Sequence, residues 1–201
     1  MKILTKKIFP VLVVILSIAC AKDFKIKNSE YSHFFKEGST LVYDVSSWGD
    51  KYELMIEIKK IDKNLYYKYL VEDDTIFKFV DNVTVLQKSL ESSDRIFMNL
   101  WDYSVSNLEN KTSVFFSKKV FKDLVNKKEV IIDVGDGEEH LTFERKTVYN
   151  CVVDGKEVGL KAVYATSDLF GYFWILDDER FPLILKMEVG YIIELKEMST
   201  K

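Results

Sequence analysis

The feature that most constrains this fold is a hydrophobic alternation with a period of two, which dominates the chain from Ser39 onward. Apolar side chains stand at every second position from Tyr52 to Ile58, and all but one of the positions between and beside them are charged, a pattern that predicts a half-buried β-strand. The same alternation returns at 158–164, 183–187 and 191–195. Because successive side chains of a strand point to opposite faces, each run can bury one side against a core.

Turn-forming residues separate these runs at short intervals. Asp154-Gly155, between two alternating runs, is the strongest short hairpin signal in the chain, because both residues tolerate the positive φ of a tight hairpin turn. Further turn signals stand at 48–50, 62–64, 81–82, 135–137 and 177–178. Such closely spaced turns predict an antiparallel meander of about ten strands.

One segment departs from the period of two. Residues 117–126 carry apolar side chains at helical spacing, and Ser117 is a suitable N-cap. Residues 29–36 are a second, shorter helix candidate, which would place three aromatic side chains on the sheet: Tyr31, Phe34 and Phe35. A flat sheet of ten strands would leave an apolar face uncovered. We therefore expect a mainly β fold, a curled antiparallel sheet (an open or half β-barrel) of about ten strands wrapped around one amphipathic helix.

The N-terminus has the construction of a secretory signal peptide. Residues 1–7 carry three lysines and no acid, residues 8–18 are almost entirely apolar, and Ala19 is a small residue directly before Cys20. Residues 16–20 resemble the lipobox of bacterial lipoproteins, in which the cysteine is acylated and becomes the new N-terminus. Ser17 departs from the usual aliphatic residue of that motif. The alternatives are an ordinary cleaved signal and an uncleaved anchor, although the apolar run is shorter than the roughly 20 residues that span a bilayer.

The lipobox resemblance implies three parts. Residues 1–19 are the lipoprotein signal peptide, residues 20–36 are the lipidated Cys20 with a polar tether, and residues 37–201 are a single β-rich domain. Palmitate and the other acyl chains on Cys20 would hold the protein on a membrane, since several chains together give stable anchoring. The expected location is the cell envelope, as a lipoprotein anchored in the outer membrane, on its periplasmic or surface face.

Composition excludes several classes of protein. The chain has a net charge of −3, which becomes about −6 once the three lysines of the signal peptide are removed. A mildly acidic protein is poorly suited to nucleic acid, whose phosphates need a basic patch. With Cys20 acylated, Cys151 is the only remaining cysteine, so the mature chain can form no internal disulfide. Cys151 lies in a β-type run, where we expect a small buried apolar side chain.

No pattern of catalytic, metal-binding or cofactor-binding residues stands out. The two histidines, His33 and His140, have no Cys or His neighbour at metal-ligand spacing. The acidic residues 177–179 could form a carboxylate pair, but they fall between two predicted strands, where acids commonly solvate a turn. We therefore expect a protein that is not an enzyme and has no metal or cofactor.

Aromatic side chains are the richest candidate for a binding function. The chain contains fourteen Phe, eleven Tyr and three Trp, and at 115–116 and 173–174 two aromatic residues are consecutive. Such pairs are explained either by burial on both faces of a strand or by a face that lines a cleft for an apolar ligand. The candidate ligand-binding residues lie in adjacent predicted strands: Phe77, Phe79, Phe97, Trp101, Phe116, Phe173 and Trp174.

At the level of the whole pattern, the chain resembles two groups of envelope proteins. Its predicted architecture is similar to that of the LolA/LolB-like open β-barrel lipoprotein carriers. Four segments, 38–45, 112–121, 173–176 and 181–183, together with the final strand, resemble the domain of unknown function 3108 group. The resemblance implies an envelope protein with a hydrophobic concavity and carries over no catalytic residue. The expected function is binding of a lipid or acyl chain. The alternative is a structural or assembly lipoprotein that docks on another envelope protein through an aromatic surface.

Overall fold

The computed structural model describes residues 31, 34–47, 49–72, 78–96, 107–135 and 137–200, without the side chains of 78–81. The signal peptide, Cys20 and most of the predicted tether lie outside the described residues, as does His33. Of the candidate ligand-binding residues, Phe77, Phe97 and Trp101 also lie outside them.

One large sheet contains all eleven strands of the described residues. Its order is β5-β4-β3-β2-β1-β11-β10-β9-β8-β7-β6. The strands are β1 (Thr40–Ser47), β2 (Asp50–Ile61), β3 (Leu65–Glu72), β4 (Lys78–Val85), β5 (Asn107–Leu108), β6 (Glu129–Asp133), β7 (Glu138–Val153), β8 (Lys156–Ser167), β9 (Tyr172–Leu176), β10 (Ile184–Glu188) and β11 (Tyr191–Ser199). Neighbouring strands pair antiparallel, except for the short parallel pairs β4–β5 and β11–β7. The predicted mainly β fold is confirmed.

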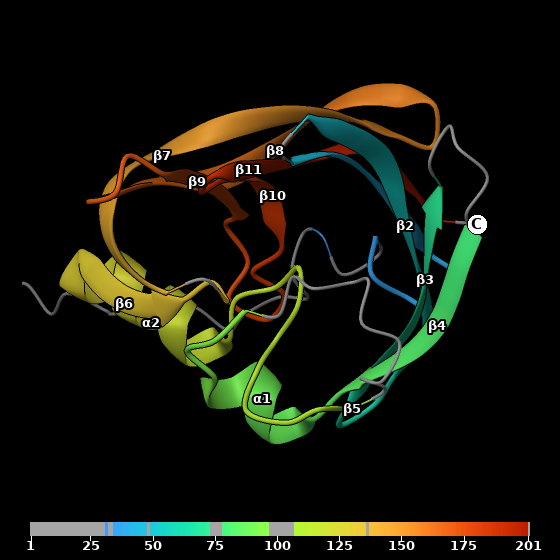
Figure 1. The fold of residues 1–201 in the computed structure, drawn as a ribbon, viewed down its shortest axis with the longest axis horizontal. Helices are drawn as coiled ribbons and strands as arrows, with labels where there is room; N and C mark the ends of the chain where they lie inside the picture. Colours follow the sequence, from blue (N-terminus) through green and yellow to red (C-terminus); the bar gives the residue numbers. More distant parts are fainter. Residues whose placement is uncertain are drawn as a thin grey trace, which may run out of the picture.

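The sheet curls into a partial ring, as Figure 1 shows. Two helices, α1 (Gln87–Ser92) and α2 (Lys118–Lys127), lie where the ring is open, between its β6 and β5 ends. Helix α2 packs against β6 and β7, and α1 packs against α2. The sequence predicted α2 and a short helix at residues 29–36, but not α1, which has six residues and no side-chain N-cap to signal it.

The alternating pattern decides which side chains fill the ring. Leu54, Ile56 and Ile58 on β2 are at most 1% exposed, as their spacing predicted. The hairpin turn predicted at 154–155 joins β7 to β8, and its residues have φ of 49° and 77°. Positive φ at both positions matches the twist of the flanking strands, which is why Asp-Gly suits this turn.

Helix α2 confirms the predicted break in the period of two. The Ser117 hydroxyl accepts a hydrogen bond from the Val120 amide at 3.2 Å and so caps the helix. Val120, Phe121 and Leu124 are buried under it, against the sheet. The helix ends at Lys128, whose φ of 72° is left-handed.

The N-terminal part of the folded region has turns where residues 29–36 were expected to form a short helix. The Phe34 amide donates to the Tyr31 carbonyl at 2.9 Å, and the described residues of 31–38 contain no helix. Tyr31 and Phe35 are nevertheless buried in the core, and the Tyr31 hydroxyl accepts from the Lys161 amide of β8 at 2.8 Å. The folded part therefore includes two residues of the segment assigned to the tether.

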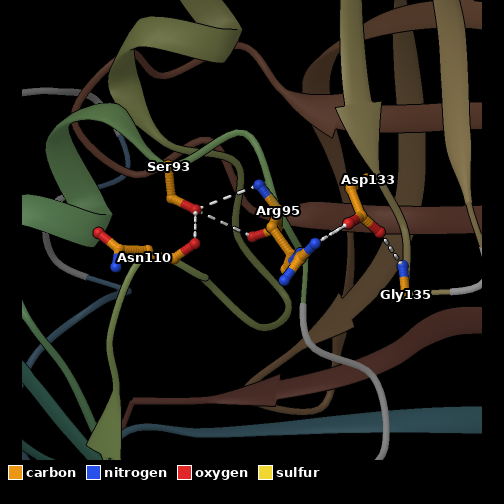
Figure 2. A network of polar contacts seen from close by, with 5 residues as sticks. All are labelled: Ser93, Arg95, Asn110, Asp133 and Gly135. Atoms are coloured by element: carbon orange, nitrogen blue, oxygen red, sulfur yellow. Dashed lines mark hydrogen bonds and ion pairs between the residues drawn. The ribbon is translucent and has the colours of Figure 1, made fainter.

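A polar network joins the two ends of the ring (Figure 2). The Ser93 hydroxyl donates to the Asn110 carbonyl at 2.7 Å and accepts from the Arg95 amide at 3.1 Å. Arg95 Nε in turn donates to the Asp133 carboxylate at the end of β6, at 2.6 Å. Asp133 also accepts from the Gly135 amide at 2.8 Å, which fixes the turn that leads to β7. This network links β6 to the segment that follows β5, across the opening where the two edge strands do not pair.

Candidate functional site

The described candidate ligand-binding residues lie on two different faces of the sheet. Phe116 and Phe173 are 2% and 0% exposed, and their rings meet inside the ring of strands at 5.9 Å. Trp174 is half-buried on the opposite face, with its ring 4.7 Å from that of Tyr164. Consecutive residues of a strand point in opposite directions, so Phe173 and Trp174 cannot line one pocket. Phe79 lies in β4, in register with Val71 of β3.

A pocket of about 690 Å³, here called the mouth pocket, lies beside α1 and the β2–β3 turn. Segments far apart in the chain build it: residues 35–37, the β2–β3 turn, α1, residues 115–118 and residues 180–182. Its apolar lining consists of Phe35, Ile61, Leu90, Phe115, Phe116, Phe181 and Pro182. Its volume falls within the range of small-molecule sites. Phe116 is the one described candidate residue that lines it.

The apolar lining is held in place by aromatic packing. Phe35 stacks on Phe181, with ring centroids 5.5 Å apart and planes 19° apart. Phe115 is 2% exposed and lies in an isolated antiparallel bridge with Leu183. The Phe116 amide donates to the Pro182 carbonyl at 2.9 Å. These contacts fix 115–116 beside 181–183, so the floor of the pocket is built before any ligand arrives.

The rim of the mouth pocket is charged. Its cations are Lys36, Lys60, Lys63, Lys118 and Arg180, and its acids are Glu37, Asp62 and Glu91. Lys60 pairs with Asp62 at 2.8 Å, and this contact lowers the pKa of the Asp62 carboxyl. Lys118 pairs with Glu91 at 2.6 Å. An apolar floor under a charged rim is suited to an amphipathic molecule.

A second depression of about 690 Å³ lies over β1, β2 and β11 and is acidic. Glu194, Asp44, Glu53 and Glu72 are register partners on adjacent strands and all line it. Lys196 lies 3.4 Å from the Asp44 carboxylate and 3.6 Å from that of Glu53. Like charges in register repel each other, and the lysine offsets part of that repulsion.

The candidates for acid–base chemistry all have structural partners. Asp177 pairs with Lys146 at 2.7 Å, and Glu179 pairs with Lys122 at 2.7 Å. Asp178 is buried and accepts from the Arg180 amide at 3.0 Å.

The structure also bears on the reactivity of Cys151 and on metal binding. Cys151 is buried, and this burial raises the pKa of its thiol to about 11, which keeps it protonated and unreactive at neutral pH. Within the described ranges no group of three or more His, Cys, Asp or Glu side chains could hold a metal ion.

Sequence reasoning missed two features of the site. Arg180 and the lysines of the rim come from separate turns, and nothing in their local sequence predicts that they meet. The exposed hairpin tip at Leu169 and Phe170, 64% and 95% exposed, was also missed. Two large apolar residues stand between Asp168 and Gly171, and this was the available signal.

Fold and site together define a mainly β protein with a curled sheet and an amphipathic pocket. Comparison with known proteins found no matching family model, no matching curated protein and no matching solved structure. In the part of the chain that is described, no helix is long and apolar enough to cross a membrane.

Proposed function

We propose that this protein is an envelope lipoprotein, anchored through acylated Cys20, that binds a lipid or another acyl-chain molecule in the mouth pocket without catalysing a reaction. The observation that carries this proposal is the pairing of an aromatic floor with a charged rim in a pocket of about 690 Å³. Apolar pockets with a few convergent polar groups are the usual form of small-molecule sites. The open half-barrel and the predicted resemblance to envelope lipid carriers belong to this proposal.

The ligand's apolar part would lie against the rings at the floor. Phe115 and Phe116 are almost fully buried by the fold itself, so they offer a fixed wall, whereas Leu90 of α1 is only partly buried and lies at the edge. Burying a methylene against such surfaces is worth roughly 0.8 kcal/mol. An acyl chain of a dozen carbons would therefore gain more from this pocket than a compact polar molecule would.

Native mass spectrometry and uptake of a fluorescent fatty acid by the purified full chain test the proposal. We expect co-purifying lipid or saturable uptake. Leu90→Trp would fill the edge of the pocket and should reduce uptake at least tenfold. Ile131→Trp is the matched control, because Ile131 is 47% exposed on β6 and does not line the pocket. No lipid and no uptake by the unmodified chain would refute the proposal.

The alternative is a structural or assembly lipoprotein, and the hairpin tip between β8 and β9 favours it. Phe170 is 95% exposed and Leu169 is 64% exposed, which is unusual for two adjacent large apolar residues. Exposed apolar groups of this kind mark contact surfaces. Under this alternative, Phe170→Asp would abolish docking on another envelope protein, whereas Leu90→Trp would leave docking unchanged.

A further inference from the structure

The rim of the mouth pocket has an excess of positive charge in a chain whose net charge is −3. After the pairs Lys60–Asp62 and Lys118–Glu91 are set aside, three cations remain on the rim: Lys36, Lys63 and Arg180. Among the described residues, the side chains of these three cations have no hydrogen-bond or ion-pair partner, and Lys63 interacts electrostatically with Asp62. Glu37 is the one remaining acid of the rim, and it interacts electrostatically with Lys60. The local field of the pocket is therefore positive.

Arg180 is the most informative of these cations. Its side chain is half-buried, and its Nε is fully shielded from solvent without a hydrogen-bond partner among the described residues. Shielding a charged donor that has no acceptor costs free energy, because its bonds to water are lost. The two acids that precede Arg180 in the chain do not accept a hydrogen bond from its Nε. Glu179 pairs with Lys122, and Asp178 accepts from the backbone amide of Arg180.

Arg180 lines the mouth pocket, where the guanidinium N–H groups other than the shielded Nε can meet an anionic oxygen. A guanidinium binds a carboxylate or phosphate through two parallel N–H···O bonds, and such charge-assisted bonds are about twice as strong as neutral ones. The floor rings Phe116 and Phe181 lie in the same pocket as Arg180. An apolar chain attached to the anion could therefore contact the floor while its head reaches the guanidinium.

Building on the proposed function, we propose that the ligand of the mouth pocket is a single-chain amphiphile with an anionic head, and that Arg180 binds that head with Lys36 and Lys63 nearby. The shared chemistry is a carboxylate or phosphate on an alkyl chain, as in a free fatty acid or an alkyl phosphate. Arg180 is thus the residue that determines specificity for the head, and the aromatic floor determines specificity for the tail.

Calorimetry on the purified full chain with three ligands of equal chain length tests this inference. Dodecanoate, dodecyl phosphate and dodecanol share a tail and differ in the head. We expect both anions to bind at least tenfold more tightly than the alcohol, which is about 1.4 kcal/mol. The tighter of the two anions identifies the head. Added salt should weaken binding of the anions and not of the alcohol, because it screens the charges of the rim.

Variants of Arg180 test whether this residue causes the tighter binding of anions. Arg180→Gln should lower the affinity for dodecanoate at least tenfold and leave that for dodecanol unchanged, and Arg180→Lys should fall between. Arg145→Gln is the matched control: Arg145 lies over the Tyr164 ring at 4.6 Å and does not line the pocket. Its affinities should equal those of the unmodified chain.

The outcomes separate this inference from the proposed function. Equal binding of dodecanoate and dodecanol would overturn the inference and leave the proposed function standing. Equal losses for acid and alcohol in Arg180→Gln would also overturn it, because Arg180 would then only shape the pocket. Inorganic phosphate that competes as well as dodecyl phosphate would do the same, since the tail would be irrelevant. Failure of all three amphiphiles to bind would refute the proposed function itself.

Discussion

Phe170 and Phe173 lie three positions apart and have opposite environments. Phe173 is fully buried inside the ring, whereas Phe170 is 95% exposed and has a left-handed backbone with φ of 68°. The turn around Phe170 is held by the Ser167 hydroxyl, which accepts from the Leu169 and Gly171 amides at 3.2 and 3.1 Å. This conformation costs about 1–2 kcal/mol for a residue with a Cβ. The hairpin therefore keeps an apolar side chain in solvent at an energetic cost.

Substitution of these two residues should have opposite effects on stability. Phe173→Ala should lower the free energy of unfolding by about 3–5 kcal/mol, because it leaves a cavity in the core. Phe170→Gly should leave it unchanged or raise it by up to about 1 kcal/mol, because glycine adopts positive φ without strain. Urea unfolding of both variants measures this. A large loss in Phe170→Gly would contradict the prediction.

Because the thiol of Cys151 is buried, we expect the folded protein to lose stability at alkaline pH. Burial raises the pKa of its thiol from an ordinary value of 9.0 to about 11, so the unfolded chain releases this proton at lower pH than the folded chain. The contribution is fully present below pH 9 and is lost as the pH rises toward 11. Urea unfolding between pH 8 and 10 should show stability falling with pH. The fall should be smaller in Cys151→Ala, and identical slopes would contradict the prediction.

Among the elements, α2 depends on a single cap. Ser117→Ala removes the acceptor of the Val120 amide and should lower the free energy of unfolding by about 1 kcal/mol. Ser92→Ala in α1 is the control, because the Ser92 hydroxyl is exposed and donates to the Lys88 carbonyl of its own helix. Its effect should stay within about 0.5 kcal/mol. Thermal unfolding of the two variants tests the contribution of the cap. Equal shifts in unfolding temperature would show that the Ser117 cap contributes no more than an ordinary exposed serine.

The elements that could be predicted are those whose signal is local. The β7–β8 hairpin follows from Asp154-Gly155 and its flanking alternation, and α2 follows from its cap and its apolar face. Helix α1 could not be predicted, because six mainly polar residues carry no apolar period. Tyr164 was expected to be buried with Leu160, yet it is half-buried beside Trp174 on the face opposite Phe173. Ala162 and Val163 of β8 are both buried, so side chains on both faces of the strand are covered there.

For the whole molecule, the sequence predicts attachment through Cys20. Cys20→Ser should move the protein from the membrane fraction to the soluble fraction of a bacterial host and abolish incorporation of labelled palmitate, because the thiol that receives the acyl chain is gone. Cys151→Ser is the control and should stay membrane-bound and labelled. A Cys20→Ser protein that remains in the membrane fraction would contradict lipid anchoring and favour an uncleaved anchor.

The mouth pocket forms only when the whole molecule is folded. Its walls come from five segments that span residues 35 to 182, and each of them is unremarkable on its own. Phe116 was predicted as a ligand-binding residue because it is one of two consecutive aromatic residues. Arg180 was not predicted, because its significance lies in the absence of a hydrogen-bond partner for its Nε, which depends on everything folded around it. Sequence patterns report on neighbours in the chain, and this site is made of neighbours in space.

By itself, the sequence determined the class of fold and the main hairpins, because period-two alternation and turn residues act over a few positions. It also predicted the lipid anchor from local chemistry at Cys20. Only the tertiary structure decided how the sheet curls and how Ser93, Arg95 and Asp133 link across its opening. It alone placed Phe173 inside and Trp174 outside, and it set Arg180 above an aromatic floor. These outcomes depend on long-range register and packing, which arise only when distant segments compete for the same buried volume.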